Sequence, residues 1–311
     1  MKILITGGAG FIGRWVTKKF LKNHEVIVLD NLSNSIKQNI QEFLIDTKFT
    51  FIQGNILNQQ ILKKSFTDVD LCIHLAAAVN VQESLDYPEI YFKNNVVGTY
   101  NILEECRKKD VRLIFCGTCM VYDIAGSEPI NEEHKIKPKS PYASSKIMGE
   151  ELALSYHYGY GLPVTVVRPF NTYGPFQKSN AEGGVVNIFI KRWLEGKDLL
   201  IFGDGNQTRD LMYIEDCVNF FECVVRNVKG DGEVFNAGTG KDTKIKDLAY
   251  IICEDPSRIK YVLHPHPQSE IYKMICDPTK ARKILGWHLK NSLKAGIDKT
   301  IVWMRSQEGR L

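Results

Sequence analysis

Short apolar runs alternate with longer amphipathic segments over the first half of the chain. The apolar runs predict buried strands at 1–6, 25–29, 49–53, 70–75, 112–116 and 164–168. The segments between them predict helices at 14–22, 89–109 and 142–157. Ser140 and Pro141 supply an N-cap and a first-turn proline for the last of these helices. Repeated strand–helix–strand units predict an α/β fold, a doubly wound parallel sheet with helices on both faces.

The pattern loosens after residue 168. Glycine-rich loops surround one predicted helix at 185–195, and the remaining chain alternates short helices, loops and strands. We expect a first domain over 1–168, joined by a return segment near 210–237, and a smaller α/β C-terminal lobe over 169–311 that binds the substrate. The sequence shows no internal repeat or flexible linker, so the two parts should pack together.

The first strand runs into a glycine-rich turn at 7–13. Gly8, Gly10 and Gly13 match G-x-G-x-x-G between a strand and a helix. One glycine makes the tight turn, another lets the backbone approach a pyrophosphate, and the third lets helix and strand pack closely. The pyrophosphate then lies at the positive end of the helix dipole. The turn predicts a Rossmann-like dinucleotide-binding domain.

The second strand ends in Asp30, at the spacing expected for the carboxylate that binds an adenosine ribose. An acid accepts the 2′-hydroxyl and repels a 2′-phosphate, so the sequence favours NAD over NADP. The alternative is that Asp30 only caps the next turn. Since ligands of such sheets bind beyond the carboxyl ends of the strands, one rim should hold the glycine turn, Asp30, Asn55, 76–78 and Thr118.

Composition narrows the class of partner. The 311 residues are 44% hydrophobic and 24% charged, with a net charge of +4. This mild positive charge suits an anionic small substrate and does not favour nucleic acid or a membrane surface. No signal peptide or membrane span is expected. The eight cysteines are mostly single and lie in apolar segments, which favours a reducing cytoplasmic location. Cys116 and Cys119 form a lone C-x-x-C, so no metal site is expected.

Tyr142 and Lys146 form Y-x-x-x-K on a predicted helix, which places both side chains on one face. A lysine ammonium beside the phenol, together with an oxidised nicotinamide, favours the phenolate. The tyrosine could then act as a general base near neutrality. Thr118, at the end of the fifth strand, could hold the same substrate oxygen. The alternative is an exposed helical Tyr–Lys pair.

Taken together, these residues identify a resemblance that spans nearly the whole chain. The sequence resembles the extended short-chain dehydrogenase/reductases, of the nucleotide-sugar epimerase/dehydratase kind. The motifs that carry the resemblance are Thr6 to Gly13, Asp30 to Ser33, His74 to Ala77, Asn95 to Thr99, Thr118 with Val121 and Tyr122, Tyr142 with Lys146, Arg168 to Pro175, Gly203 to Gly205, and Gln207 to Asp210 ahead of Tyr213 to Asp216.

The resemblance implies a tightly held, recycled NAD and a nucleotide-diphosphate sugar, most often a UDP-sugar. Tyr142 would take a proton from a sugar hydroxyl, usually at C4, while Thr118 bonds that oxygen and Lys146 positions the nicotinamide ribose. Asn171, Arg209, Met120 and Gln268 would contact the substrate. The resemblance also implies a homodimer through 89–109 and 142–157. The implied cofactor contacts are Gly7, Gly10, Phe11, Ile12, Gly13, Asp30, Asn31, Asn55, Ile56, Leu75, Ala76, Ala77, Asn95, Tyr142 and Lys146.

Two departures from the family pattern concern binding. Asn55 replaces a frequent aspartate after the third strand, and its amide can still accept a bond from the adenine amino group. An arginine that usually contacts the diphosphate is replaced within 267–270, so this contact is weaker or comes from His264 or His266.

The third departure concerns the reaction. Members that make 4-keto-6-deoxy sugars usually carry Asp-Glu after the threonine, whereas this chain has Cys119 and Met120. A 4-epimerase needs no further acid or base, so it is the favoured interpretation. The rival is an unusual 5,6- or 4,6-dehydratase, similar to the tunicamycin-type branch, in which Cys119 replaces one carboxyl group. A UDP-glucuronate decarboxylase ranks third, and a non-catalytic NAD-binding sensor is the alternative from another class.

Overall fold

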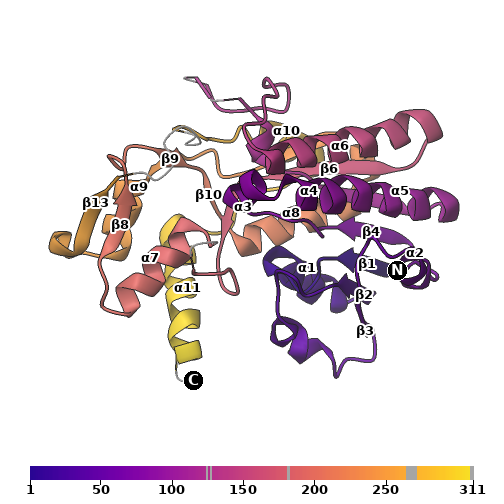
Figure 1. The fold of residues 1–311 in the computed structure, drawn as a ribbon, viewed down its shortest axis with the longest axis horizontal. Helices are drawn as coiled ribbons and strands as arrows, with labels where there is room; N and C mark the ends of the chain where they lie inside the picture. The colour runs from indigo at the N-terminus through magenta and orange to yellow at the C-terminus, as the bar shows by residue number, and fades with distance from the viewer. Residues whose placement is uncertain (124, 127, 181–182, 264–271, 309–311) are drawn as a thin grey trace.

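One parallel sheet organises the molecule. The computed structural model describes residues 1–123, 125–126, 128–180, 183–263 and 272–308 (Figure 1). Seven strands pair in the order β11-β6-β5-β4-β1-β2-β3, and every neighbouring pair is parallel. The doubly wound fold predicted from the apolar runs is confirmed. The strands are β1 (Lys2–Thr6), β2 (Glu25–Asp30), β3 (Phe49–Gln53), β4 (Leu71–His74), β5 (Arg112–Cys116), β6 (Val164–Pro169) and β11 (Val234–Ala237).

Side chains of β1 alternate between two buried layers, as the pleat requires. Ile3 and Ile5 pack in the layer that contains α1 (Phe11–Leu21) and α8 (Ile214–Arg226). Leu4 packs in the opposite layer, against α5 and α6. Figure 1 shows α5 and α6 running alongside each other. The helices of this second layer are α2 (Gln59–Ser65), α3 (Val81–Asp86), α4 (Pro88–Tyr91), α5 (Gly98–Lys109) and α6 (Pro141–Tyr160).

The segment predicted as one helix at 89–109 is not a regular α-helix. The six residues Phe92–Val97 between α4 and α5 are π-helical. A π-turn adds one residue to the helical turn and rotates the following side chains, and such turns are frequent at functional sites. The prediction of a uniform helix is therefore corrected, and Asn95 lies within the altered turn.

The edge strand β11 comes from far along the chain. It pairs with β6 in the register Val234↔Val166 to Ala237↔Pro169. The chain thus leaves the sheet after β6 and returns to it only after α8.

The remaining strands form three smaller pairs. β7 pairs with β10 and β8 with β13 in parallel, whereas β9 pairs with β12 antiparallel. Among the described residues, no helix is long and apolar enough to cross a membrane. The elements outside the main sheet and its second helix layer, other than α1 and α8, are β7 (Asn171–Tyr173), α7 (Val185–Leu194), β8 (Leu199–Phe202), β9 (Thr208–Arg209), β10 (Leu211–Tyr213), β12 (Thr243–Lys244), α9 (Ile245–Ile252), β13 (Ile259–Val262), α10 (Thr279–Leu285) and α11 (Leu293–Glu308), with 3-10 turns at Lys37–Phe43, Cys119–Val121, Val228–Gly230 and Pro256–Arg258.

Candidate active site

The turn between β1 and α1 requires glycine at two positions for different reasons. Gly7 has φ +71°, and a Cβ there would lie 2.7 Å from the Ala76 backbone nitrogen. A Cβ on Gly13 would lie 2.1 Å from the Gly7 carbonyl oxygen. The first glycine lets the turn approach the β4 loop, and the second lets α1 begin directly against it. This is the close packing that the sequence motif predicts.

The N-terminus of α1 is open to an anion. Its N-cap is Gly10, no side chain caps it, and the first turn contains no acidic residue. The N–H groups of Phe11, Ile12 and Gly13 precede the first intrahelical bond, which Arg14 N donates to Gly10 O at 2.9 Å. Unpaired N–H groups at the positive end of a helix dipole suit a pyrophosphate. This cradle fits the dinucleotide that the glycine pattern predicts.

Asp30 lies beside the glycine turn and fixes its backbone. One carboxylate oxygen accepts from Ala9 N at 3.0 Å, and the other accepts from Leu32 N at 2.8 Å and Ser35 Oγ at 3.0 Å. Asn39 Nδ2 donates to the Ala9 carbonyl at 2.9 Å, so both backbone polar groups of Ala9 are held. The negative charge therefore has a defined place at the carboxyl end of β2.

The other predicted cofactor contacts lie along the same rim. Asn55 Oδ1 accepts from Leu57 N at 2.9 Å, so this amide oxygen already bonds within its own turn. Asn31 is exposed and its Oδ1 accepts from Ser33. Ile56 is buried, whereas 75–77 follow β4 half-buried beside the glycine turn.

Asn95 joins the π-helical turn to the β4 loop and to α6. Its Oδ1 accepts from Ala78 N at 2.8 Å, and its Nδ2 donates to Ala78 O and to Ser145 Oγ, both at 2.9 Å. The Ser145 hydroxyl in turn donates to the Tyr142 carbonyl at 2.8 Å. Every polar atom of this buried amide is thus used, as burial of a polar side chain demands.

Tyr142, Lys146 and Thr118 meet where α6 passes the end of β5. Tyr142 and Lys146 are both buried on α6, one turn apart. Thr118 caps the short Cys119–Val121 turn by accepting from Met120 N at 3.2 Å, and its side chain also hydrogen-bonds Tyr142. The structure therefore brings together the three residues that the sequence predicts to act on one hydroxyl.

Burial is the largest influence on the pKa values of Tyr142 and Lys146, which the spacing of the two residues in the sequence does not show. Burial raises the pKa of the Tyr142 phenol, and the hydrogen bond from Thr118 lowers it. Burial lowers the pKa of the Lys146 ammonium, and the nearby Glu150 carboxylate raises it. Lys146 Nζ lies 4.6 Å from the centroid of the Phe115 ring, which stabilises its charge. The Lys146 charge alone therefore does not set the tyrosine's ionisation in this structure.

Cys119 is a buried, protonated thiol. Its Sγ lies 3.3 Å from the Met274 Sδ. Asn171 Nδ2 lies 3.9 Å from that Met274 sulfur. Burial and the charge of Asp210 raise the pKa of this thiol to about 12, and Arg209 opposes that shift. Cys119 therefore stays neutral near pH 7.

The predicted substrate contacts cluster on the C-terminal side of this group. Asn171 begins β7, Arg209 ends β9, and Met120 follows Cys119, all three half-buried. The Arg209 guanidinium donates to the Thr208 carbonyl at 2.7 Å. Gln268, His264 and His266 lie outside the described residues.

Comparison with known proteins decides the family. The sequence profile of the NAD-dependent epimerase/dehydratase family matches residues 3–238. The chain belongs to this family. It is therefore an NAD-dependent enzyme, which confirms the predicted cofactor and the resemblance carried by the motifs.

Family members with different reactions are similar to this chain. The protein Pal of Bacillus thuringiensis is 51% identical in sequence, with a TM-score of 0.96 over 99% of this chain and 100% of Pal. A putative UDP-glucose 4-epimerase of Methanocaldococcus jannaschii is 37% identical over 98% of both chains. The dTDP-glucose 4,6-dehydratase of Streptomyces venezuelae, solved with NAD and TYD bound, is 28% identical, with a TM-score of 0.93 over 100% of this chain and 98% of that one.

The sequence did not predict a buried ion pair between α6 and β6, close to Tyr142 and Lys146. Glu150, two turns after Tyr142, is paired with Arg168 of β6, whose Nε donates at 3.1 Å. Arg168 also donates to the Tyr122 hydroxyl at 2.5 Å, and that hydroxyl donates to Asn236 Oδ1 of β11 at 2.8 Å. A charged residue within the apolar run of β6 was the available signal.

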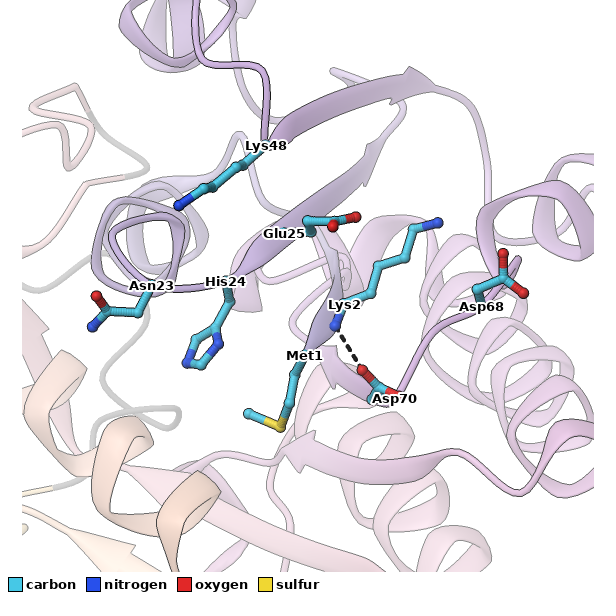
Figure 2. Close-up of a pocket in the computed structure, with 8 residues that line it drawn as sticks. All are labelled: Met1, Lys2, Asn23, His24, Glu25, Lys48, Asp68 and Asp70. Atoms are coloured by element: carbon cyan, nitrogen blue, oxygen red, sulfur yellow. Dashed lines mark hydrogen bonds between the residues drawn. The ribbon is translucent and has the colours of Figure 1, made fainter.

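A pocket at the amino ends of the strands is separate from this site, which lies at their carboxyl ends (Figure 2). It lies at the amino ends of β1 and β2, where Lys2 N donates to Asp70 Oδ2 at 2.7 Å. Its charges have both signs, so it does not resemble the anion cradle at α1. The lining residues are Met1, Lys2, Asn23, His24, Glu25, Lys48, Asp68 and Asp70.

Proposed function

We propose that this enzyme is a 4-epimerase of a UDP-hexose or UDP-N-acetylhexosamine that works through transient oxidation at C4. One observation carries the choice of reaction. The two positions after Thr118 hold a neutral thiol and a thioether, Cys119 and Met120, and neither is an ionised acid or base. A 4-epimerase needs none there, because the group that takes the proton of the C4 hydroxyl can also return it.

The buried residues supply the proton chemistry. Tyr142 takes the proton of the C4 hydroxyl, and Thr118 holds the same oxygen by hydrogen bonding. Lys146 lies one helical turn after Tyr142, and its positive charge favours the phenolate form of Tyr142. NAD, when bound, supplies the hydride acceptor and donor. The keto sugar turns within the pocket, and Tyr142 returns the proton to the opposite epimer's hydroxyl.

The binding roles follow the same geometry. We assign the pyrophosphate of NAD to the N-terminus of α1 and the adenosine ribose to Asp30. Arg209 and Asn171 would hold the diphosphate of the sugar nucleotide, since the planar guanidinium matches two phosphate oxygens. Residues 1–168 with the return segment near 210–237 would form the NAD-binding domain, and the rest of 169–311 the sugar-nucleotide lobe.

We further propose a cytoplasmic homodimer. Exposed apolar side chains lie along α5, α6 and the π-helical turn before α5, namely Phe92, Tyr100 and Met148. An apolar surface of this kind on two adjacent helices suits a second copy of the chain. All eight cysteines are free thiols, which supports a reducing compartment.

A dehydratase is the second candidate, because the Cys119 thiol stands directly after Thr118. A protonated thiol beside Thr118 can donate a proton. After oxidation at C4, such a donor would protonate the C6 hydroxyl as it leaves as water, and a separate base would have to take the C5 proton. The S. venezuelae dehydratase shares the fold over the full length of this chain, which supports this candidate.

Proton NMR in D₂O distinguishes the two candidates. The purified protein is incubated without added cofactor, in separate tubes, with UDP-glucose, UDP-galactose and UDP-N-acetylglucosamine. Interconversion of gluco and galacto anomeric signals without deuterium at C5 supports the epimerase. Exchange at C5 with new methyl or vinyl signals supports the dehydratase, and Cys119→Ala should then lose that product while Cys119→Ser retains part of it.

A matched pair of variants tests the catalytic assignment. Tyr142→Phe should lower turnover by about 10²- to 10⁴-fold, because it removes the acid–base group. Tyr160→Phe makes the same change on the same helix at an exposed ring and should behave as wild type. Turnover that survives in Tyr142→Phe would refute the assignment.

A further inference from the structure

His74 is a polar ring at the end of an otherwise apolar strand. It is the last residue of β4 and only 1% exposed. Its Nδ1 lies 2.7 Å from the Thr6 hydroxyl of β1, and its Nε2 lies 3.1 Å from the Thr99 hydroxyl of α5. Both ring nitrogens are therefore bonded to hydroxyl groups on elements far apart in sequence.

The neighbouring bonds determine where the ring proton lies. The Thr99 hydroxyl donates to the Asn95 carbonyl at 2.6 Å, which uses its single proton. Thr99 must therefore accept from His74, so the proton is on Nε2. Nδ1 is then an acceptor, and the Thr6 hydroxyl donates to it. Thr6 Oγ1 itself accepts from Ala76 N at 3.2 Å, which is consistent with this direction.

The chain of hydrogen bonds continues to the catalytic helix. Asn95 donates to Ser145 Oγ at 2.9 Å, and Ser145 donates to the carbonyl of Tyr142 at 2.8 Å. One end of the chain is thus Thr6, directly before the glycine turn. The other end is the backbone of Tyr142.

We propose that His74 is a positioning residue which, as the neutral Nε2–H tautomer, fixes the glycine turn relative to Tyr142. Its effect on turnover rests on the catalytic role proposed for Tyr142. The ring is suited to the task because it accepts at one nitrogen and donates at the other across a fixed distance. A protonated ring would donate at both nitrogens and break the bond from Thr6.

The surroundings keep the ring neutral. Burial and the positive charge of Lys146 lower the pKa of His74 to about 3. The Phe115 ring packs against it, with 5.8 Å between ring centroids. The tautomer and the geometry therefore hold across the physiological range.

The tautomer is measured first, on the full-length enzyme. Long-range ¹H–¹⁵N correlation of the histidine rings, with His74→Phe used to assign the signal, should show a protonated Nε2 and an unprotonated Nδ1. The pattern should not change between about pH 8 and 5. A protonated Nδ1, or a ring that titrates in this interval, would overturn the proposal.

The positioning role is measured with hydroxyl deletions of matched shape. Thr99→Val and Thr6→Val should each lower kcat by about ten- to a hundredfold, because small displacements of reacting groups cost that much. KM for the UDP-sugar should stay nearly constant. Thr99→Ser restores the hydroxyl and should recover kcat. Thr17→Val is the control, since the buried Thr17 hydroxyl has no hydrogen-bond partner among the described residues.

The readouts separate the two proposals. If Thr6→Val and Thr99→Val match Thr17→Val in kcat, His74 does not position the site. If wild-type protein turns over no UDP-sugar, the proposed function fails. In that case the His74 tautomer and the NAD affinities of the variants test the role of His74. The proposal requires Thr6→Val and Thr99→Val to bind NAD more weakly than Thr17→Val does.

Discussion

At the scale of single residues, neutral His74 links stability to pH. Below about pH 6.5 the unfolded chain binds a proton on this ring that the folded protein excludes, because the folded pKa is about 3. The contribution of His74 to the free energy of unfolding should therefore fall by about 1.4 kcal/mol per pH unit as the pH drops from about 6.5 to about 3. Above about pH 6.5 this contribution is fully present.

Urea unfolding at several pH values measures this slope. His74→Phe should show a flatter dependence between about pH 6.5 and 4.5, since its unfolded state has one basic ring fewer. His24, whose pKa is also lowered by burial, contributes to both proteins and cancels in the comparison. Equal slopes would mean that His74 charges in the folded state.

Gly13 gives a second prediction at this scale. Gly13→Ala places a Cβ 2.1 Å from the Gly7 carbonyl oxygen, so the turn must move. We expect a loss of about 1–3 kcal/mol in stability and at least a tenfold loss in NAD affinity. Thermal unfolding and NAD titration measure both.

Gly159→Ala is the matched control. This glycine lies on α6, where an added Cβ meets nothing within 4 Å. An alanine there should be neutral or stabilise the helix by up to about 1 kcal/mol. If Gly13→Ala behaved in the same way, the close contact between α1 and the turn would not be required.

At the scale of elements, the Glu150–Arg168 pair fastens α6 to β6. Arg168→Met leaves the Glu150 carboxylate, 0% exposed, without its cation. We expect a loss of about 3–5 kcal/mol in the free energy of unfolding, because an uncompensated buried charge is costly. Glu150→Gln in the same chain should recover part of that loss.

An exposed pair provides the comparison for this prediction. Arg226 pairs with Glu222 along α8, and its side chain is 74% exposed. Arg226→Met should therefore cost less than about 1 kcal/mol in chemical unfolding. If Arg168→Met lowered the free energy of unfolding by as little, the stability of the protein would not depend more on the buried pair than on the exposed one.

The elements also show what the sequence could and could not predict. The strands were predictable because buried parallel strands are continuous apolar runs, and 49–53 and 112–116 match β3 and β5 in full. The π-helical turn was not, since one extra residue per turn leaves little trace in a side-chain pattern. The chain through His74 was also missed, because hydrogen bonds between residues distant in sequence have no period. Tyr142 and Lys146 were found because their spacing is local.

At the scale of the whole molecule, cofactor binding should stabilise the fold. A ligand that binds only the folded state adds about 2.7 kcal/mol at a hundred times its dissociation constant. Protein stripped of NAD should therefore unfold at a lower temperature and recover when NAD is returned. NADP at equal concentration should raise Tm less, because the Asp30 carboxylate repels a 2′-phosphate. Equal shifts would contradict the assigned role of Asp30.

The late return of β11 bears on how the protein is made. While the chain emerges from the ribosome, β6 is complete at Pro169, but its outer neighbour is not synthesised until Val234–Ala237. During that interval β6 presents unpaired backbone groups to other nascent chains, as any open edge strand does. Synthesis that pauses or ends before residue 234 should therefore yield an aggregation-prone fragment that needs chaperones, even though that fragment holds the glycine turn, Tyr142 and Lys146.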